Sequence, residues 1–142
     1  MGAAIQSYTR DWSERTGITV TLVLDSNLGR LPEAIELSVF RIVQETLSNV
    51  RKHAQATGVE ICLKHTSPRM LLITVADNGR GLADGFDFSA LAVEGHYGLL
   101  GISERIALLG GRLKLSNQQD SGLMVQVEIP HPRVEVSMNL VT

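Results

Sequence analysis

The sequence predicts an α/β fold of the two-layer, α+β type, in which helices cover one face of a mixed, mostly antiparallel sheet. Short β-branched segments of alternating polarity are spread along the chain, and segments with helical periodicity separate them. Most of the strand-like segments come in neighbouring pairs that can form hairpins, which favours antiparallel pairing. A length of 142 residues corresponds to one domain of this kind.

The first half of the chain is expected to form a helix, a strand and a long helix. Residues 5–16 mix polar and apolar positions and stop before Gly17, which is typical of a helix with a glycine after its end. The segment ITVTLVL, residues 18–24, is β-branched and alternates, so it predicts a strand. Pro32 then opens the longest helix, which we expect over residues 33–54.

The second half is expected to contain two hairpins that are separated by a long loop and a helix. Alternating polarity predicts strands at residues 59–65, 70–77, 112–116 and 123–129, and helical spacing predicts a helix at residues 102–110. Between residues 78 and 98, glycine, small and acidic residues follow no period, which indicates a loop. The tail after residue 132 is a strand, a partner-binding segment or unstructured.

Composition excludes several classes of function. The apolar fraction of 44% and the formal charge of -2 are ordinary for a globular protein and give no general attraction to nucleic acid or anionic lipid. Cys62 is the single cysteine, and it has no ligand spacing with the histidines, so neither a disulfide within the chain nor a Cys/His metal site is expected. We expect a reducing, cytoplasmic setting.

The polar side of the long helix carries a distinctive set of residues. It consists of Glu45, Asn49, Lys52 and His53, and the apolar side consists of Phe40, Val43, Leu47, Val50 and Ala54. The polar side is either a solvated face or a site where oxygens of Glu45 and Asn49 hold Mg²⁺ and a water against a polyphosphate. Because an Asn side chain competes with the helical backbone for hydrogen bonds, a compensating role is expected for Asn49.

A second candidate site follows the strand MLLITVAD. The strand ends in Asp77, and the next residues, NGRGL, place glycines at positions 79 and 81. Asp77 shares a side of the strand with Ile73 and Val75, so we expect its carboxylate at the rim of an apolar layer, where it needs donors. Either the turn's own N–H groups supply them, as in an Asx turn, or a planar ligand entering over the glycines donates from an amine.

A third candidate is the stretch GHYGLLGISERI, in which Gly98 and Gly101 stand directly before a predicted helix. Free N–H groups and the helix dipole make the start of a helix a phosphate site, and glycine allows close approach. Turn chemistry or lid flexibility explains two such glycines equally well when they are taken alone.

In this order, the three candidates resemble the N-box, first glycine box and second glycine box of the ATP-binding catalytic (HATPase) domain of sensor histidine kinases. These domains belong to the GHKL superfamily, which also holds DNA gyrase, heat-shock chaperone and mismatch-repair ATPases, and adopt the Bergerat ATP-binding fold. The resemblance covers about residues 18–130. The segments FRIVQETLSNVRKHA and HYGLLGISERIALLGG are most similar to those of nitrate/nitrite-sensor-like kinases.

The resemblance implies that ATP and Mg²⁺ are the cofactors. Asn49 would coordinate Mg²⁺ through its side-chain oxygen, and Glu45 would polarise or position a water or the metal. These two residues would be the catalytic ones. Lys52 and His53 would lie near the phosphates, and Arg80 would add positive charge to the pocket.

The two glycine boxes would hold the ends of the nucleotide. Asp77 would accept a hydrogen bond from the adenine amino group, and Gly79 and Gly81 would admit the base. The segment of Gly98, Leu100 and Gly101 would cradle phosphate under a lid spanning residues 82–97. One departure concerns the late glycine-threonine turn of many relatives, which here reads Ser121, Gly122 and Leu123.

The resemblance also implies partners and a division of the chain. The phospho-accepting histidine of the family lies on a helical hairpin beside an acidic residue, and none of His53, His65, His96 or His131 has such a setting. We therefore expect part of a longer kinase, anchored in the inner membrane or not, whose own dimerisation domain carries the acceptor histidine. Residues 1–17 would be the end of that dimerisation region, residues 18–131 the ATP-binding domain and residues 132–142 a tail.

The further partner implied is a response regulator with a helix-turn-helix output domain, and the piece alone would be monomeric. Two alternatives compete with the histidine kinase. One is another GHKL ATPase or an anti-sigma-type serine kinase. The other is a docking module that keeps the fold without nucleotide chemistry. Nucleic-acid binding is not expected, since no basic cluster is interleaved with aromatic residues.

Overall fold

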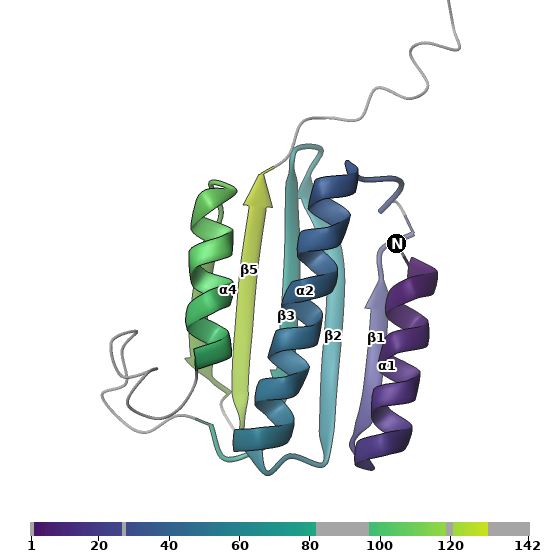
Figure 1. Ribbon diagram of the computed structural model, residues 1–142, viewed down its shortest axis with the longest axis vertical. Helices are drawn as coiled ribbons and strands as arrows, with labels where there is room; N and C mark the ends of the chain where they lie inside the picture. Colours follow the sequence, from purple (N-terminus) through teal and green to yellow (C-terminus); the bar gives the residue numbers. More distant parts are fainter. Residues whose placement is uncertain (1, 27, 82–96, 119–120, 131–142) are drawn as a thin grey trace, which may run out of the picture.

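The computed structural model describes residues 2–26, 28–81, 97–118 and 121–130, and it has the two layers that the sequence predicts (Figure 1). Its elements, in chain order, are α1 (Gly2–Thr16), β1 (Thr19–Leu24), α2 (Glu33–Asn49), a π-helical turn η1 (Val50–Ala54), β2 (Gly58–Ser67), β3 (Met70–Asp77), α4 (Tyr97–Leu108), β4 (Arg112–Asn117) and β5 (Leu123–Pro130). Helices α1, α2 and α4 all lie on one face of the sheet (Figure 1). The predicted fold class is confirmed.

The sheet is mixed, as expected. Its five strands are ordered β1-β2-β3-β5-β4. β1 pairs with β2 in parallel, and the other neighbouring strands pair antiparallel. The parallel pair needs a crossover connection, and α2 supplies it. The predicted hairpins are confirmed as β2–β3 and β4–β5, and β3 and β5 meet in the middle of the sheet.

The core lies between the helices and the sheet. On α2 the buried residues recur at helical spacing, and Val39, Ile42, Val43 and Leu47 have no exposed surface. On β3 every second residue from Leu71 to Asp77 is buried, so Asp77 ends the apolar side of that strand, as predicted. Among the described residues, no helix is both long and apolar enough to cross a membrane.

Two helix boundaries differ from the predictions. α4 was expected from residue 102 but begins at Tyr97, so Gly98 and Gly101 lie inside the helix and not before it. Glycine lowers helix stability by about 1 kcal/mol relative to alanine, but packing of the buried Ile102 and Ile106 within the core overrides that local preference. The long helix does extend to residue 54, but its last turn, Val50–Ala54, is π-helical.

Helix α1 belongs to the same core as the sheet. Ile5 and Trp12 are 0% and 3% exposed and lie in one cluster with residues of α2, β2 and β3. The Thr9 hydroxyl, also buried, donates to the Ile5 carbonyl at 2.9 Å, which satisfies it within the helix. The domain boundary expected between residues 17 and 18 therefore lies between helix α1 and strand β1, which are in contact.

Trp12→Ala tests this integration. Removing a buried indole costs the transfer free energy of the side chain plus that of the cavity left behind, so the free energy of unfolding should fall by about 3–5 kcal/mol. The measurement is denaturant unfolding followed by circular dichroism. Arg10→Ala, at an exposed position of the same helix, is the control and should change the value by less than about 0.5 kcal/mol. A Trp12→Ala protein as stable as the control would show that α1 is dispensable.

Candidate functional site

The candidate residues gather at one end of the two layers, where β3 and α2 end and α4 begins (Figure 1). β3 delivers Asp77 to this end, and the last turns of α2 and η1 deliver Asn49 and His53. α4 packs against α2 and brings its first turn, with Gly98, to the same end. Segments far apart in the sequence are thus brought together by the sheet order and the helix packing.

Asp77 is 3% exposed, and its two carboxylate oxygens have different surroundings. Oδ1 accepts hydrogen bonds from the backbone N–H of Gly79 at 2.8 Å and of Leu123 at 3.3 Å. Oδ2 accepts none from the described residues, and no buried side-chain oxygen or nitrogen among those residues lacks a partner, so Oδ2 keeps contact with solvent. The Asx turn is therefore present, and a second oxygen remains for a ligand.

Burial raises the pKa of the Asp77 carboxyl above its usual value, because removal from water disfavours the charged form. The hydrogen bonds from the Gly79 and Leu123 N–H groups act in the opposite direction and are the smaller effects. The carboxylate therefore costs folding free energy in its charged state.

The loop after Asp77 packs directly onto the end of the long helix. The Arg80 N–H donates to the Ala54 carbonyl at 2.8 Å, and the Arg80 Nε donates to the His53 carbonyl at 2.7 Å. Any Cβ at Gly79 would overlap the Ala54 carbonyl oxygen. Glycine at position 79 therefore allows the loop to approach η1 closely, and both carbonyls are ones that a helix end leaves without helical donors.

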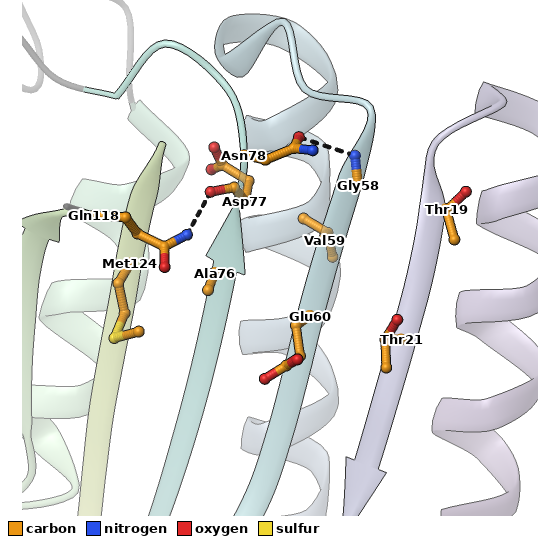
Figure 2. Close-up of a pocket in the computed structure, with 10 residues that line it drawn as sticks. All are labelled: Thr19, Thr21, Gly58, Val59, Glu60, Ala76, Asp77, Asn78, Gln118 and Met124. Atoms are coloured by element: carbon orange, nitrogen blue, oxygen red, sulfur yellow. Dashed lines mark hydrogen bonds between the residues drawn. The ribbon is translucent and has the colours of Figure 1, made fainter. Parts of the chain in front are cut away.

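Asn78 fastens the same loop to the start of β2 (Figure 2). Its Oδ1 accepts from the N–H groups of Thr57 at 2.9 Å and Gly58 at 3.0 Å, and its Nδ2 donates to the Thr57 hydroxyl at 2.9 Å. On the other side, the Gln118 Nε2 donates to the Asp77 carbonyl at 2.6 Å (Figure 2). The Asp77–Gly81 loop is thus held from both sides.

The turn that departs from the family pattern also contacts this loop. The Ser121 hydroxyl donates to the Gly79 carbonyl, and the Leu123 N–H donates to Asp77. Gly122 has a φ of 106°, and a Cβ there would overlap the Asp77 carbonyl oxygen. This turn therefore supports the Asp77–Gly81 loop without a threonine, and Leu123 alone of its residues hydrogen bonds the carboxylate in the described structure.

Glu45 meets the first turn of α4. A Cβ at Gly98 would lie 2.8 Å from Glu45 Oε2, so the carboxylate occupies the space that the glycine leaves empty. Glu45 and Gly98 both line a cavity of about 360 Å³ between α2 and α4, together with Arg41, Ile42, Gly101, Ile102 and Arg105. The second glycine segment is therefore brought to the polar face of α2.

The other expected site residues are placed as follows. Asn49 is 8% exposed, although it belongs to the polar set of the helix. Lys52 is exposed and His53 half-buried, both within η1, where the angles of about 100° per residue that aligned them in the sequence no longer apply. Gly81 has a φ of 73° and lies beside the Asn117 side chain. The lid expected at residues 82–97 falls outside the described residues, apart from the backbone of Tyr97.

Asp77 lines a different cavity, of about 340 Å³, which is formed mainly by residues of the sheet (Figure 2). None of its lining residues also lines the cavity that contains Glu45. Asp77 and Glu45 therefore line separate cavities. In these residues no group of three or more His, Cys, Asp or Glu side chains could hold a metal ion, and a magnesium site built from few protein oxygens would not form such a group.

Sequence reasoning missed three contributors. Ala54 offers a backbone carbonyl, which no sequence pattern reveals. Asn78 was read only as part of the glycine box, although Asn directly after a strand is a common turn former. Arg105 lies at helical spacing from Gly101, a signal that was available in the sequence.

The sequence and the fold both match known proteins. Residues 34–133 match the family model for "Histidine kinase-, DNA gyrase B-, and HSP90-like ATPase". The chain is 33% identical over 126 residues to the signal transduction histidine-protein kinase/phosphatase DegS of Brevibacillus brevis, covering 89% of this chain and 31% of DegS. It is 32% identical over 130 residues to the oxygen sensor histidine kinase NreB of Staphylococcus carnosus, covering 92% of this chain and 36% of NreB. The chain thus spans about a third of the length of these curated relatives.

Two solved structures illustrate the likeness in fold. The histidine kinase domain of the blue-light-activated histidine kinase EL346 from Erythrobacter litoralis aligns with a TM-score of 0.74 at 24% identity, over 91% of this chain and 60% of that one. Full-length ShkA in complex with AMPPNP aligns with a TM-score of 0.75 at 20% identity, over 93% of this chain and 29% of that one. These likenesses show the fold.

Gly79→Ala and Gly101→Ala form a matched pair for the packing of the Asp77–Gly81 loop. The Gly79 variant places a methyl group against the Ala54 carbonyl, so it should destabilise the protein by about 1–3 kcal/mol. At Gly101 no atom of the described part of the chain lies within 4 Å of the added Cβ, and the higher helix propensity of alanine should leave stability equal or higher. The measurement is thermal unfolding. Equal melting temperatures for the two variants would contradict the close packing.

Asp77→Asn tests the cost of the buried acid. The folded-state pKa is raised, so the native protein binds the proton more tightly than the unfolded chain, and the penalty of the charged form is present above the folded pKa. Asn keeps an acceptor for both N–H groups and carries no charge. The variant should be at least as stable as the unmodified protein at pH 7, and its advantage should disappear as the pH falls below about 4, the unfolded value.

The measurement is urea unfolding of both proteins between pH 3 and pH 8. The difference between their free energies of unfolding cancels the titration of the groups that the two proteins share. Lower stability of Asp77→Asn at pH 7 would show that the charged carboxylate stabilises the fold.

Proposed function

Because the chain belongs to the family of histidine kinase-, DNA gyrase B- and HSP90-like ATPases, we propose that it is the ATP-binding catalytic domain of a sensor histidine kinase. In this proposal the domain binds MgATP and donates the γ-phosphate to a histidine on a dimerisation domain, from which a response regulator of the helix-turn-helix output type receives it. The resemblance to sensor histidine kinases predicted from the sequence is confirmed by the relatives DegS and NreB.

The meeting of three distant segments at one end of the sheet carries the proposal. A buried acid with one open oxygen ends β3, a buried Asn ends α2, and Glu45 lies against Gly98 of α4. A nucleotide needs such a set, because its base, its metal-bound phosphates and its terminal phosphate are recognised by different chemistry. The same end holds all three groups.

Asp77 is proposed to read the base. Its Oδ2, which the turn does not use, would accept a hydrogen bond from the adenine amino group. Guanine carries a carbonyl oxygen at the equivalent position, which would repel the carboxylate, so the site should prefer adenine. The raised pKa of Asp77 indicates that keeping this acceptor in its charged form lowers the folding stability. Gly79 and Gly81 would leave the approach of the base free of side chains.

Asn49 and Glu45 are proposed to hold Mg²⁺ through oxygen atoms. Hard divalent cations prefer oxygen ligands, and magnesium keeps several waters, so one amide and one carboxylate are a sufficient protein contribution. The two residues are one helical turn apart, about 6 Å along the axis of α2. When bound, Mg²⁺ would neutralise charge on the phosphates. Lys52 and His53 in η1, with Gly98, Leu100 and Gly101 in α4, would complete the phosphate environment.

In phosphoryl transfer the protein contributes little covalent chemistry. The domain would position the γ-phosphate and stabilise its charge while the acceptor histidine attacks in line. Named histidine kinases match nearly the whole chain, which favours this activity over another GHKL ATPase, a serine kinase or a docking module without nucleotide chemistry. We also propose a cytoplasmic location, where ATP is present and Cys62 stays reduced, and a monomeric state for this domain alone.

The first test is calorimetric titration of the protein with ATP, with and without Mg²⁺, for the unmodified chain and Asn49→Ala. Saturable binding that requires the metal is expected for the unmodified chain. Loss of one oxygen ligand should weaken MgATP binding by about tenfold or more, because a hydrogen bond or ligand contact to a charged group contributes about 1.5–3 kcal/mol.

Gln126→Ala provides the matched control. It also removes an amide, but from the side of β5 that faces away from the core, and it should bind MgATP like the unmodified chain. Asn49→Ala with unchanged affinity would remove Asn49 from the metal site, and an unmodified chain that binds no nucleotide would contradict the proposed function.

A further inference from the structure

The cavity between α2 and α4 continues beyond the residues already assigned. Its polar side chains are Arg41, Glu45 and Arg105, and its apolar part is formed by Ile42 and Ile102, both buried. Glu45 lies at the boundary between the proposed metal site and this cavity, one helical turn from Asn49. Because Arg41 lies one turn before Glu45, the cavity extends along α2 toward the start of that helix, away from the end that holds Asp77.

Two glycines form the α4 side of this cavity, and their surroundings differ. Gly98 leaves the space that the Glu45 carboxylate fills. A Cβ at Gly101, one turn further along α4, would meet no atom of the described residues within 4 Å. A group of the size of a phosphate could thus lie against the backbone of α4 at this point, beside Glu45, where the magnesium site is proposed.

Arg105 is the cation best placed to reach that space. It follows Gly101 by four residues, so the two positions share one face of α4, about 6 Å apart along the axis. Side chains on a helix lean toward its N-terminus, which directs the Arg105 side chain toward Gly101 and Gly98. By the same rule Arg41 on α2 leans away from Glu45, and its guanidinium donates to the Gln44 Oε1 at 3.4 Å.

The charge of Arg105 is not used elsewhere in the described structure. Its side chain is exposed, and the ion pair observed among the described residues joins Arg112 to Glu128. A guanidinium that lines this cavity and makes no ion pair with the described residues suits a doubly charged phosphate, with which it can form paired N–H···O bonds.

We propose that Arg105 binds the terminal phosphate of ATP in this cavity and makes the domain prefer the triphosphate over the diphosphate. This inference rests on the proposed function and assigns one more residue to that site. ADP lacks the phosphate that Arg105 would contact, so the arginine contributes to binding of the substrate and not of the product. A kinase with this preference releases ADP readily after transfer.

The test compares the affinities of MgATP and MgADP, measured by calorimetry, for the unmodified protein, Arg105→Ala and Arg105→Lys. The unmodified protein should bind MgATP more tightly than MgADP. Arg105→Ala should weaken MgATP binding by about tenfold and change MgADP binding by less than about twofold. Arg105→Lys keeps the positive charge but not the paired N–H geometry, so its affinity for MgATP should lie between those of the unmodified protein and Arg105→Ala.

Arg69→Ala is the control, since it removes an equally exposed arginine in the turn between β2 and β3, outside the cavity. Its ratio of ATP to ADP affinity should equal that of the unmodified protein. Circular dichroism of each variant confirms folding, which truncation of an exposed side chain should preserve.

Equal weakening of ATP and ADP in Arg105→Ala, or an unchanged ratio, would overturn the assignment of Arg105 while nucleotide binding itself stands. An unmodified protein that binds ATP and ADP equally would overturn it as well. Failure of the unmodified protein to bind either nucleotide would instead overturn the proposed function and this inference together.

Discussion

The structure depends on the packing of the Asp77–Gly81 loop against the end of the long helix. Arg80 reaches the carbonyls of His53 and Ala54 from its side chain and its backbone, and Gly79 lets the two backbones approach. This contact joins the end of a central strand to the end of the helix that carries Glu45 and Asn49. The separation between the proposed base reader and the proposed metal ligands is therefore set by the two Arg80 hydrogen bonds and by the close approach of the two backbones at Gly79.

Asp77 shows how a site is built at the expense of stability. Most residues at the end of an apolar strand face would be apolar, and burial of a carboxylate there raises its pKa and costs folding free energy. The turn residues reduce that cost by hydrogen bonding one oxygen, but they leave the other to solvent. The protein therefore keeps an acid at the rim of its core with one oxygen that no described residue hydrogen bonds.

Most of the fold was predictable because apolar residues recur at helical spacing in the helices and at alternate positions in the strands. The strands were placed within a few residues, and Asp77 was correctly put on the apolar side of its strand. The misplaced start of α4 and the π-helical turn had a different cause. Gly98 and Gly101 disfavour a helix locally, and the sequence contains no measure of how strongly Ile102 and Ile106 pack; similarly, the fit of η1 against Gly79 decides the last turn of the long helix.

The sequence by itself determined which chemical groups the protein has and in what order: the acid and amide of the long helix, the acid and glycines after a strand, and the glycines of the third segment. These are local patterns, which can be recognised in the sequence without knowing which residues are in contact. Only the tertiary structure decided that β3 lies beside β5, that Glu45 fills the space at Gly98, and that Asp77 has one oxygen bound and one open. Such facts arise between residues distant in the chain, whose pairing depends on packing of the whole core.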